Sequence, residues 1–357
     1  TALDGTNGFR LDGINAADYT GAKVSSAGDV NADGLDDLII GAFGPNSNAG
    51  ASYVVFGHLD AFPAVIDLAT LDGSNGFRLD GIDADDRSGT SVSSAGDVNG
   101  DGFDDVIIGA FLADSGASDT REGESYVVFG KAGGFDAVID LASLDGTNGF
   151  RLDGIDPNDV SGGTVSDAGD VNGDGFDDLI IGATQGGAGG GRGASFVVFG
   201  KSDGFTPAIG LGTLDGTTGF RINGIDTENL ASSVSNAGDV NGDGFDDLII
   251  GAYKADPGGN IEAGESYVLF GKSGGFAATI SLANLNGANG FRLDGIDAGD
   301  FVGGRVSTAG DVNGDGFDDL IIGGRAGDPG GRDNAGESFV VFGGRSEEHT
   351  SELQSLA

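Results

Sequence analysis

The sequence predicts an all-β protein, specifically a β-propeller of five four-stranded blades. Three observations predict this fold. Three sequence blocks each occur five times along the 357 residues, each repeat divides into four short segments with strand character, and no segment keeps a helical periodicity. Several short strands repeated at a constant spacing are typical of the radial arrangement of propeller blades.

The three blocks recur in a fixed order with spacings of 68 to 73 residues. The block AGDVNADGLDDLIIGA lies at Ala27–Ala42, and its later copies begin at Ala95, Ala168, Ala237 and Ala309. The block NGFRLDGI begins at Asn7 and recurs from Asn75, Asn148, Thr218 and Asn289. The block SYVVFG, or a close variant, ends at Gly57, Gly130, Gly200, Gly271 and Gly343.

Each repeat supplies four predicted strands, named A to D. Strand A, at residues 23–27 in the first repeat, alternates polar and apolar residues, and strand B (37–42) is a continuous apolar run, as expected of a strand buried on both faces. Strand C (52–56) is β-branched and aromatic, and strand D (76–82) alternates again. Turn residues separate the four strands.

The strands follow the order D-A-B-C five times, so the chain begins with a lone strand D (8–14) and its last repeat ends after strand C at Gly343. We therefore expect the first strand to complete the fifth blade and to close the ring, which would remove two unpaired sheet edges. The same order also arises in five repeats of a larger ring. We assign residues 1–344 to the propeller. Residues 345–357 resemble a translated sequencing adapter, and we expect them to form a disordered, non-native tail.

The composition excludes several classes of function. The 57 acidic residues outnumber the 17 basic ones and give a net charge of −40, which argues against binding to nucleic acid or to anionic membrane surfaces. The chain has no cysteine, and no apolar run is long enough to cross a membrane, so we expect no membrane insertion of this segment. The acidic residues concentrate in a few recurring loops, as expected if they bind cations.

The loop between strands A and B carries the chemistry that the sequence predicts best. Its pattern, D-V-N-G-D-G-F-D-D, with Ala32 and Leu35 in the first copy, is called here the Asp-rich loop, and it spans 29–37, 97–105, 170–178, 239–247 and 311–319. Oxygens at positions 1, 3 and 5 of a tight loop converge, position 7 offers a carbonyl, and position 9 offers a further carboxylate. Ca²⁺ takes six to eight oxygen ligands, and this spacing is similar to the first half of an EF-hand loop.

We therefore predict about one Ca²⁺ per blade, five in all. The predicted ligands are Asp29, Asn31, Asp33, the Leu35 carbonyl and Asp37; Asp97, Asn99, Asp101, the Phe103 carbonyl and Asp105; Asp170, Asn172, Asp174, the Phe176 carbonyl and Asp178; Asp239, Asn241, Asp243, the Phe245 carbonyl and Asp247; and Asp311, Asn313, Asp315, the Phe317 carbonyl and Asp319. The alternative is that these side chains only form Asx turns in a solvated hairpin. Mg²⁺ suits such an all-protein cage less well than the larger ion.

The repeats resemble FG-GAP repeats, the blades of the propeller at the N-terminus of integrin α-subunits. The resemblance rests on Phe56–Gly57, on Gly41–Ala42 and on the place of the Asp-rich loop, although the fifth repeat has Gly323–Gly324 where the others have Gly-Ala. The resemblance implies a propeller with Ca²⁺ loops on its lower face, a location outside the cell or at its surface, and a role in adhesion or ligand binding. It also implies seven blades as the usual form.

The function that we predict is recognition rather than catalysis. Residues that recur in every repeat, such as the arginine of GFR, suit structural ion pairs, and His58 has no partner at a useful spacing. The B–C connections vary most between repeats and lie opposite the Asp-rich loops. Their candidates for contact with an unknown protein or glycan are Phe43, Phe111, Tyr253 and Arg325. The alternative function is a non-catalytic scaffold or accessory domain of a larger secreted enzyme.

Overall fold

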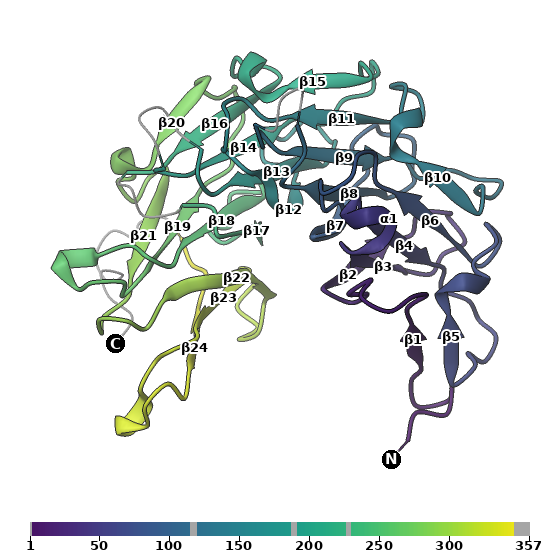
Figure 1. Ribbon diagram of the computed structural model, residues 1–357. Helices are drawn as coiled ribbons and strands as arrows, with labels where there is room; N and C mark the ends of the chain where they lie inside the picture. The colour runs from purple at the N-terminus through teal and green to yellow at the C-terminus, as the bar shows by residue number, and fades with distance from the viewer. Residues whose placement is uncertain (1, 115–119, 187–190, 226–229, 346–357) are drawn as a thin grey trace.

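The structure is a computed structural model that describes residues 2–114, 120–186, 191–225 and 230–345. Its strands form separate small sheets that stand side by side along an arc, as expected of propeller blades (Figure 1). This arrangement confirms the all-β class and the five-bladed propeller architecture that the repeats predict. In the part of the chain that the structure describes, no helix has the length and apolar character needed to cross a membrane.

Each of the first four blades is an antiparallel sheet in the order A-B-C-D from the centre outward, and the fifth has strands A, B and C. The A strands are β2 (Lys23–Gly28), β7 (Ser91–Gly96), β12 (Ser161–Gly169), β17 (Ser233–Gly238) and β22 (Val302–Gly310). The B strands are β3 (Asp37–Ala42), β8 (Asp105–Ala110), β13 (Asp178–Ala183), β18 (Asp247–Ala252) and β23 (Asp319–Gly324). The C strands are β4 (Ala51–Val55), β9 (Glu124–Val128), β14 (Ala194–Val198), β19 (Glu265–Leu269) and β24 (Glu337–Val341). The D strands are β1 (Arg10–Asp12), β6 (Gly76–Asp80), β11 (Gly149–Asp153), β16 (Gly219–Asn223) and β21 (Gly290–Asp294).

The connection from strand C to strand D adds a short fifth strand to the preceding blade. These strands are β5 (Val65–Asp67), β10 (Val138–Asp140), β15 (Ala208–Gly210) and β20 (Thr279–Ser281). Strand β10 leaves the second blade and pairs in parallel with β6, the D strand of the first blade. The sequence predicted four strands per repeat and did not indicate this fifth one. Because the chain reaches back in this way, consecutive blades are interlocked at their outer edges.

Short helical turns complete the described elements. Single 3-10 turns lie at Leu68–Thr70, Leu141–Ser143, Leu211–Thr213, Pro257–Gly259, Leu282–Asn284 and Pro329–Gly331, and the one-turn helix α1 lies at Pro45–Asn48. Four of the 3-10 turns directly follow the short fifth strands and bury their leucines, so that they anchor the C–D connections.

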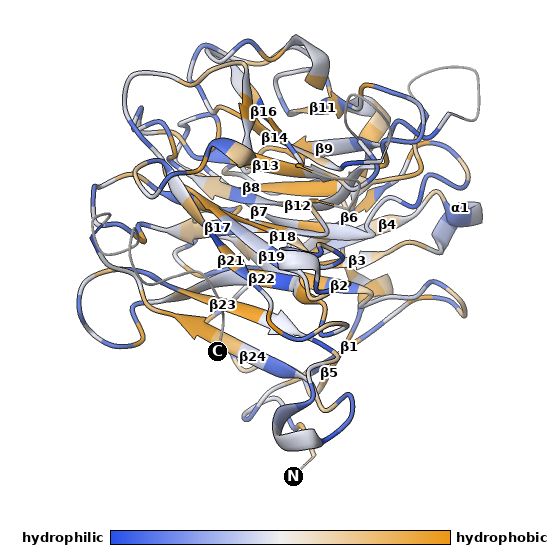
Figure 2. Ribbon diagram, turned by 90° about the vertical axis from the view of Figure 1, so that its left-hand side faces the viewer, coloured by the Kyte–Doolittle hydropathy of each residue, from blue (hydrophilic) through white to orange (hydrophobic). Residues whose placement is uncertain are grey.

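The buried apolar side chains lie between neighbouring blades and do not form a single central core. Ile39 and Val54 of the first blade belong to one buried cluster with Val92 and Ile108 of the second. Strand B is buried on both faces in the second, third and fourth blades, because a blade packs against each side of it. The orange interior of the stacked sheets in Figure 2 follows these strands.

The predicted closure of the ring by the first strand does not occur. Strand β1 pairs in parallel with β5 alone, in the register Arg10 to Val65, and the fifth blade of the described chain holds only β22, β23 and β24. The two ends of the arc are apart in Figure 1. The reason is geometric: β1 pairs only with β5 at the N-terminal end of the arc, and this end lies apart from β24 at the other end (Figure 1).

The alternating strand directions divide the connections between two ends of the propeller. The A–B connections, which are the Asp-rich loops, share one end with the C–D connections, while the B–C and D–A connections share the other end. The repeated loop pattern and the variable connections therefore lie on opposite ends of every blade. Residues 346–357, which include almost all of the predicted non-native tail, lie outside the described residues.

Candidate functional sites at the two ends of the propeller

The carboxylates at positions 1 and 5 make the same hydrogen bonds in all five Asp-rich loops, whereas the bond of the position-3 asparagine is seen in the first, second and fifth loops. The second blade shows the full set. The carboxylate of Asp97, at position 1, accepts the backbone N–H groups of Asp101 and Gly102 at 3.0 and 2.8 Å. The side chain of Asn99 accepts the N–H of Asp101 at 2.8 Å, and Asp101 in turn accepts the N–H of Phe103 at 3.1 Å. The Asx-type turns that formed the alternative interpretation are therefore present.

The aspartate at position 9 ties the loop to the FG motif. Asp105 is fully buried, and its two oxygens accept the N–H of Val98 at 3.1 Å and the N–H of Gly130 at 2.9 Å. Gly130 is the glycine of the FG pair, and a Cβ there would lie 2.4 Å from the carbonyl oxygen of Asp104. The same pair of hydrogen bonds recurs in all five blades. This contact explains physically why the FG motif and the Asp-rich loop occur together.

The buried position-9 carboxylates have raised pKa values in the first four blades. Burial, the largest cause, raises the pKa of Asp178 to about 8, the N–H of Gly200 opposes this shift, and repulsion from Asp174 and Asp170 adds to it. The pKa of Asp247 rises to about 8 and that of Asp37 to about 7 for the same reasons. The repulsion indicates that positions 1, 5 and 9 of one loop lie close enough to act on one another.

The donor set of each loop suits a hard cation, but the described side chains are not drawn together around one point. No group of three or more His, Cys, Asp or Glu side chains in the described part of the chain has the geometry to hold a metal ion. The loop oxygens accept backbone N–H groups instead. These hydrogen bonds do not exclude a cation, because each carboxylate oxygen has lone pairs beyond the one that an N–H uses.

The aspartate at position 8 forms a contact between blades that sequence analysis missed. The carboxylate of Asp177 accepts the backbone N–H of Asp97 in the preceding blade at 2.8 Å, and the N–H of Asp177 donates to the Asp97 carbonyl at 3.3 Å. Asp104, Asp246 and Asp318 make the same pair of bonds. The Asp-Asp pair that ends every loop was the available signal, since position 9 alone accounts for only one of the two residues.

The arginines of the GFR blocks form ion pairs within the blades, as predicted. Arg78 pairs with Asp80 at 2.7 Å, and Arg151 pairs with Asp153 at 2.5 Å and with Glu124 at 3.5 Å. Arg221 differs, because Asn223 replaces the aspartate, and its guanidinium lies over the ring of Phe196 instead.

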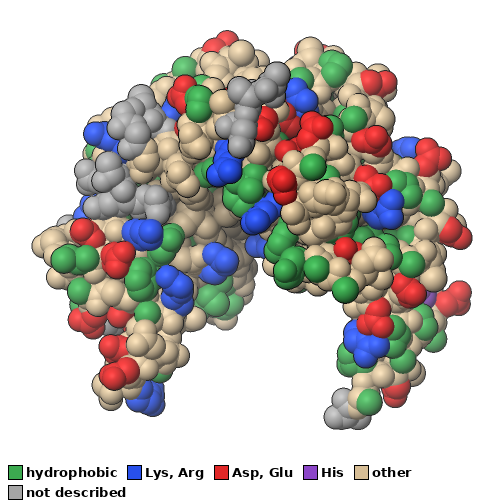
Figure 3. Space-filling view, viewed as in Figure 1, with side chains coloured by type: hydrophobic (Ala, Val, Ile, Leu, Met, Phe, Trp, Pro, Cys, Tyr) green, Lys and Arg blue, Asp and Glu red, His purple; other side chains and the backbone are tan. Residues whose placement is uncertain are grey.

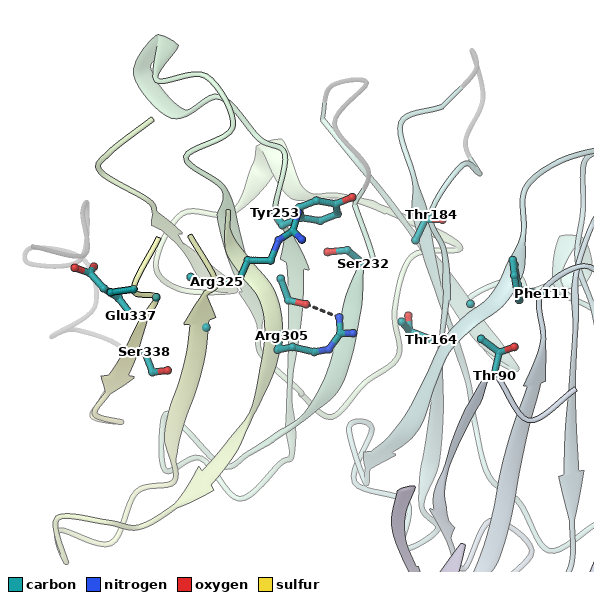
Figure 4. A pocket seen from close by; sticks show the side chains of 16 residues that line it. Thr90, Phe111, Thr164, Thr184, Ser232, Tyr253, Arg305, Arg325, Glu337 and Ser338 are labelled. Carbon is teal, nitrogen blue, oxygen red and sulfur yellow. Dashed lines mark hydrogen bonds between the residues drawn. The ribbon is translucent and has the colours of Figure 1, made fainter. Parts of the chain in front are cut away.

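A cavity of about 890 Å³ opens at the end opposite the Asp-rich loops. It is lined by residues of the second to fifth blades, and Figure 4 shows that they come from several neighbouring strands. Phe111, Tyr253 and Arg325, three of the four predicted contact residues, line it. Phe43 does not. It stacks on Tyr19 at a centroid distance of 4.8 Å, beside the guanidinium of Arg87. Parts of two B–C connections, 115–119 and 187–190, and of one D–A connection, 226–229, lie outside the described residues.

Comparison with known proteins identifies the repeats. The model of the FG-GAP repeat matches residues 20–55, 88–128, 162–198, 230–269 and 303–341, which together make up more than half of the chain. The chain belongs to the FG-GAP repeat family. Each match covers strands A, B and C of one blade and the Asp-rich loop between A and B.

Relatives of this FG-GAP protein include integrin α chains and an enzyme. Integrin alpha-5 of Xenopus laevis is 31% identical over 196 residues, which cover 51% of this chain and 17% of the integrin. Integrin alpha pat-2 of Caenorhabditis elegans is 27% identical over 269 residues, which cover 73% of this chain and 20% of that protein. A phosphatidylinositol-glycan-specific phospholipase D of Dictyostelium discoideum is 30% identical over 215 residues, 55% of this chain and 21% of the enzyme. The chain thus spans about a fifth or less of the length of these relatives.

Proposed function

We propose that this chain is a calcium-binding recognition module of an exported protein and that it holds a protein or glycan ligand outside the cell. One observation carries the proposal: the repeated, oxygen-rich loops occupy one end of every blade, and the variable connections surround a cavity at the other end. The first end suits a structural role, because its contacts repeat from blade to blade. The second end suits recognition, because its residues differ between blades.

Calcium in the Asp-rich loops would stabilise the propeller rather than act on a ligand. The position-1, position-5 and position-9 carboxylates of one loop repel one another, and a divalent cation between them would offset this repulsion. A cation that binds only the folded state stabilises that state by about 2.7 kcal/mol at a concentration of 100 times its Kd. The position-8 contacts would pass this stabilisation from one blade to the next.

The experiment that tests calcium binding is calorimetric titration of the chelator-treated chain, with melting temperatures measured in Ca²⁺ and in EDTA. We expect uptake of about one ion per Asp-rich loop and a higher melting temperature with Ca²⁺. The substitution Asp174→Ala, at position 5 of the third loop, should remove one site. Asp203→Ala is the matched control, because Asp203 is an exposed aspartate paired with Lys201 outside the loops. Absence of uptake together with equal melting temperatures would refute the proposal.

We propose further that the chain itself is not an enzyme. His58 lies in a C–D connection against the ring of Phe62 at a centroid distance of 3.8 Å, which is a packing role. A role as an accessory domain of a larger secreted enzyme is the second candidate, and the similarity to the phospholipase D favours it. Hydrolysis of a phosphatidylinositol-glycan substrate by this chain alone would contradict the non-catalytic proposal.

A further inference from the structure

Basic residues are rare in this chain. Those without a packing contact inside a blade lie toward the end of the propeller opposite the Asp-rich loops. The GFR arginines lie on D strands, and Lys131, Lys201 and Lys272 each lie over a phenylalanine ring of a C–D connection. The remaining basic residues before Arg345 lie on A strands or in B–C and D–A connections: Lys23, Arg87, Arg121, Arg192, Lys254, Arg305, Arg325 and Arg332. Figure 3 shows blue side chains around the hollow on the inner side of the arc.

Two of these residues, Arg305 and Arg325, line the 890 Å³ cavity, where Glu337 is the only acidic residue among the described lining residues. Over the whole chain, acidic residues outnumber basic ones by 57 to 17, so a lining with two arginines and one glutamate reverses the balance of the protein. No carboxylate oxygen of the described residues lies within ion-pair distance of either guanidinium. Both charges are therefore free for a ligand.

The two guanidiniums are held in place by contacts that leave most of their N–H groups available. Arg325 lies over the rings of Phe301 and Tyr253, with its central carbon 4.6 and 5.7 Å from the ring centres. A cation–π contact does not use the guanidinium N–H groups as hydrogen-bond donors to another side chain, so they remain able to bind an anion. Arg305 donates one N–H to the carbonyl oxygen of Gly304 at 2.7 Å, as the dashed line in Figure 4 marks.

Hydroxyl groups and aromatic rings form the rest of the cavity wall. The hydroxyls belong to Thr90, Thr164, Thr184, Ser232 and Ser338, and the rings to Phe111 and Tyr253. A second cavity of about 410 Å³ shares Arg305 and Ser338 with the first and contains one equivalent serine from each A strand: Ser25, Ser93, Ser166, Ser235 and Ser307. Lys23 also lines this second cavity, and its pKa is lowered by burial and by repulsion from Arg305. The positive charge of Arg305 thus stands between two hydroxyl-lined spaces.

We propose that the large cavity binds an acidic sugar, with Arg305 and Arg325 holding its carboxylate or sulfate and the hydroxyl and aromatic side chains contacting the ring. The inference rests on the proposed recognition function and names its ligand class. Guanidinium N–H groups bind such anions through charge-assisted hydrogen bonds. The hydroxyl-rich wall can donate to and accept from sugar hydroxyls, and the volume suits a ligand the size of a short oligosaccharide. An acidic peptide is the competing ligand, and its tighter binding is one of the outcomes that overturn the proposal.

The test is calorimetric titration of the whole chain with a tetrasaccharide that contains glucuronate. The matched ligand is the same tetrasaccharide with its carboxylates reduced to alcohols. A salt concentration of about 0.15 M screens charges beyond about 8 Å, so that the measurement reports the cavity and not the net charge of the protein. We expect the acidic tetrasaccharide to bind at least about tenfold more tightly than the reduced one, because charge-assisted hydrogen bonds are lost with the carboxylate.

Substitutions then locate the site. The double variant R305Q/R325Q should weaken binding of the acidic tetrasaccharide by about tenfold or more, and Glu337→Gln should strengthen it, because a repelling carboxylate is removed. Lys131→Gln is the control, since Lys131 lies at the opposite end of the propeller. Equal binding of the two tetrasaccharides, unchanged affinity in the double variant, or tighter binding of a hexaglutamate peptide would overturn the proposal. A chain that takes up Ca²⁺ but binds neither tetrasaccharide would refute this inference and leave the calcium proposal intact.

Discussion

Gly96 shows how one residue without a side chain permits the contact between two blades. It ends strand β7 with a φ of +66°, and a Cβ at this position would lie 2.2 Å from the carboxylate oxygen of Asp177. That oxygen already accepts the N–H of Asp97 at 2.8 Å. Gly28, Gly169 and Gly238 meet the corresponding aspartates in the same way. Glycine is therefore required here for both conformation and space.

We predict that Gly96→Ala lowers the free energy of unfolding by about 2–4 kcal/mol. The left-handed backbone costs about 1–2 kcal/mol for a residue with a Cβ, and displacement of Asp177 loses a charge-assisted hydrogen bond as well. Gly102→Ala is the matched control, because Gly102 has a φ of +89° but a Cβ added there would have no atom within 4 Å. Urea denaturation of both variants measures the difference, and equal losses would contradict the role of Asp177.

Glu124, a buried residue outside the Asp-rich loops, should make the stability of the fold depend on pH. It is buried, accepts the hydroxyl hydrogen of Tyr126 at 2.5 Å and lies 3.5 Å from Arg151. Burial, the largest cause, raises its pKa from 4.5 to about 7, against the opposing effects of Tyr126 and Arg151. An acid with a raised pKa favours the folded state while it is protonated, so this contribution is lost as the pH rises from about 4.5 to about 7.

In the wild-type chain, the titration of Glu124 should lower the unfolding free energy by roughly 3 kcal/mol across this pH window. We predict that Glu124→Gln lacks this decrease, because glutamine does not titrate. The substitution keeps an acceptor for Tyr126 and leaves Asp153 as the partner of Arg151. The measurement is chemical denaturation of the wild-type chain and the variant at several pH values between about 4 and 8 in saturating Ca²⁺. The difference between the two curves isolates Glu124 from the other carboxylates, and parallel curves would show that Glu124 does not titrate in this range.

At the scale of elements, the C–D connections hold neighbouring blades together through groups of three phenylalanines. Phe205 leaves the third blade, stacks on Phe150 of the second blade at a centroid distance of 4.3 Å, and lies 5.8 Å from Phe129. The groups Phe56, Phe77 and Phe135 and Phe199, Phe220 and Phe276 repeat this geometry. The FG phenylalanine is thus one member of a contact between two blades.

We predict that Phe205→Ala lowers the free energy of unfolding by about 2–4 kcal/mol, because it removes a half-buried ring and the stacking that locks β15 onto the second blade. Phe205→Leu should lose less, since it keeps most of the apolar volume. Urea denaturation provides the energies, and faster proteolysis of the C–D connection in the alanine variant would locate the loosened segment. Equal stability of the alanine variant and the wild-type chain would show that the interlock contributes nothing.

The parts of the fold that the sequence predicts are those with long or repeated signals. Strand B carries an uninterrupted apolar run after its first aspartate, and the Asp-rich loop repeats five times, so both could be recognised. Strand β10 could not, because it has three residues and its partner β6 precedes it by a whole repeat. The partner of Asp177 was missed for the same reason: the Asp-Asp pair marks position 8 as a residue with a role of its own, but the contact joins residues 80 positions apart.

The cavity marks a second limit of sequence reasoning. Phe111, Tyr253 and Arg325 could be selected because they stand in variable connections on one end of the blades. Arg305 lies on an A strand within a repeated pattern, where nothing in its neighbourhood distinguishes it from a structural residue. Only the curvature of the arc shows that it faces the same space as Arg325. Repeat patterns therefore predict blades and loops, whereas the spatial neighbours across blades follow from the packing.

At the scale of the whole molecule, the two ends of the arc carry complementary apolar faces. Val340 of the fifth blade is 48% exposed, whereas its equivalent Val268 in the fourth blade is fully buried. At the other end, Val24 is 62% exposed, whereas Val92 is fully buried. In the middle of the arc, the C-strand valine of one blade packs near the A-strand valine of the next blade: Val54 and Val92 share one buried cluster, and Val268 and Val306 share another. The exposed face of the fifth blade thus matches the exposed face of the first blade by the same repeat symmetry.

We predict that this chain associates with itself head to tail, with β1 of one copy pairing with β24 of the next. In the described part of the chain, β24 has an unpaired edge where its equivalent β19 pairs with the D strand β21, and β1 is a D strand without a C strand beside it. Such a contact is heterologous and can extend, so the sedimentation coefficient should rise with protein concentration. Val340→Glu should abolish the rise, because it places a charge in the apolar contact, whereas Val138→Glu, at an exposed site on β10, should not. A concentration-independent sedimentation coefficient of the wild-type chain would contradict the prediction.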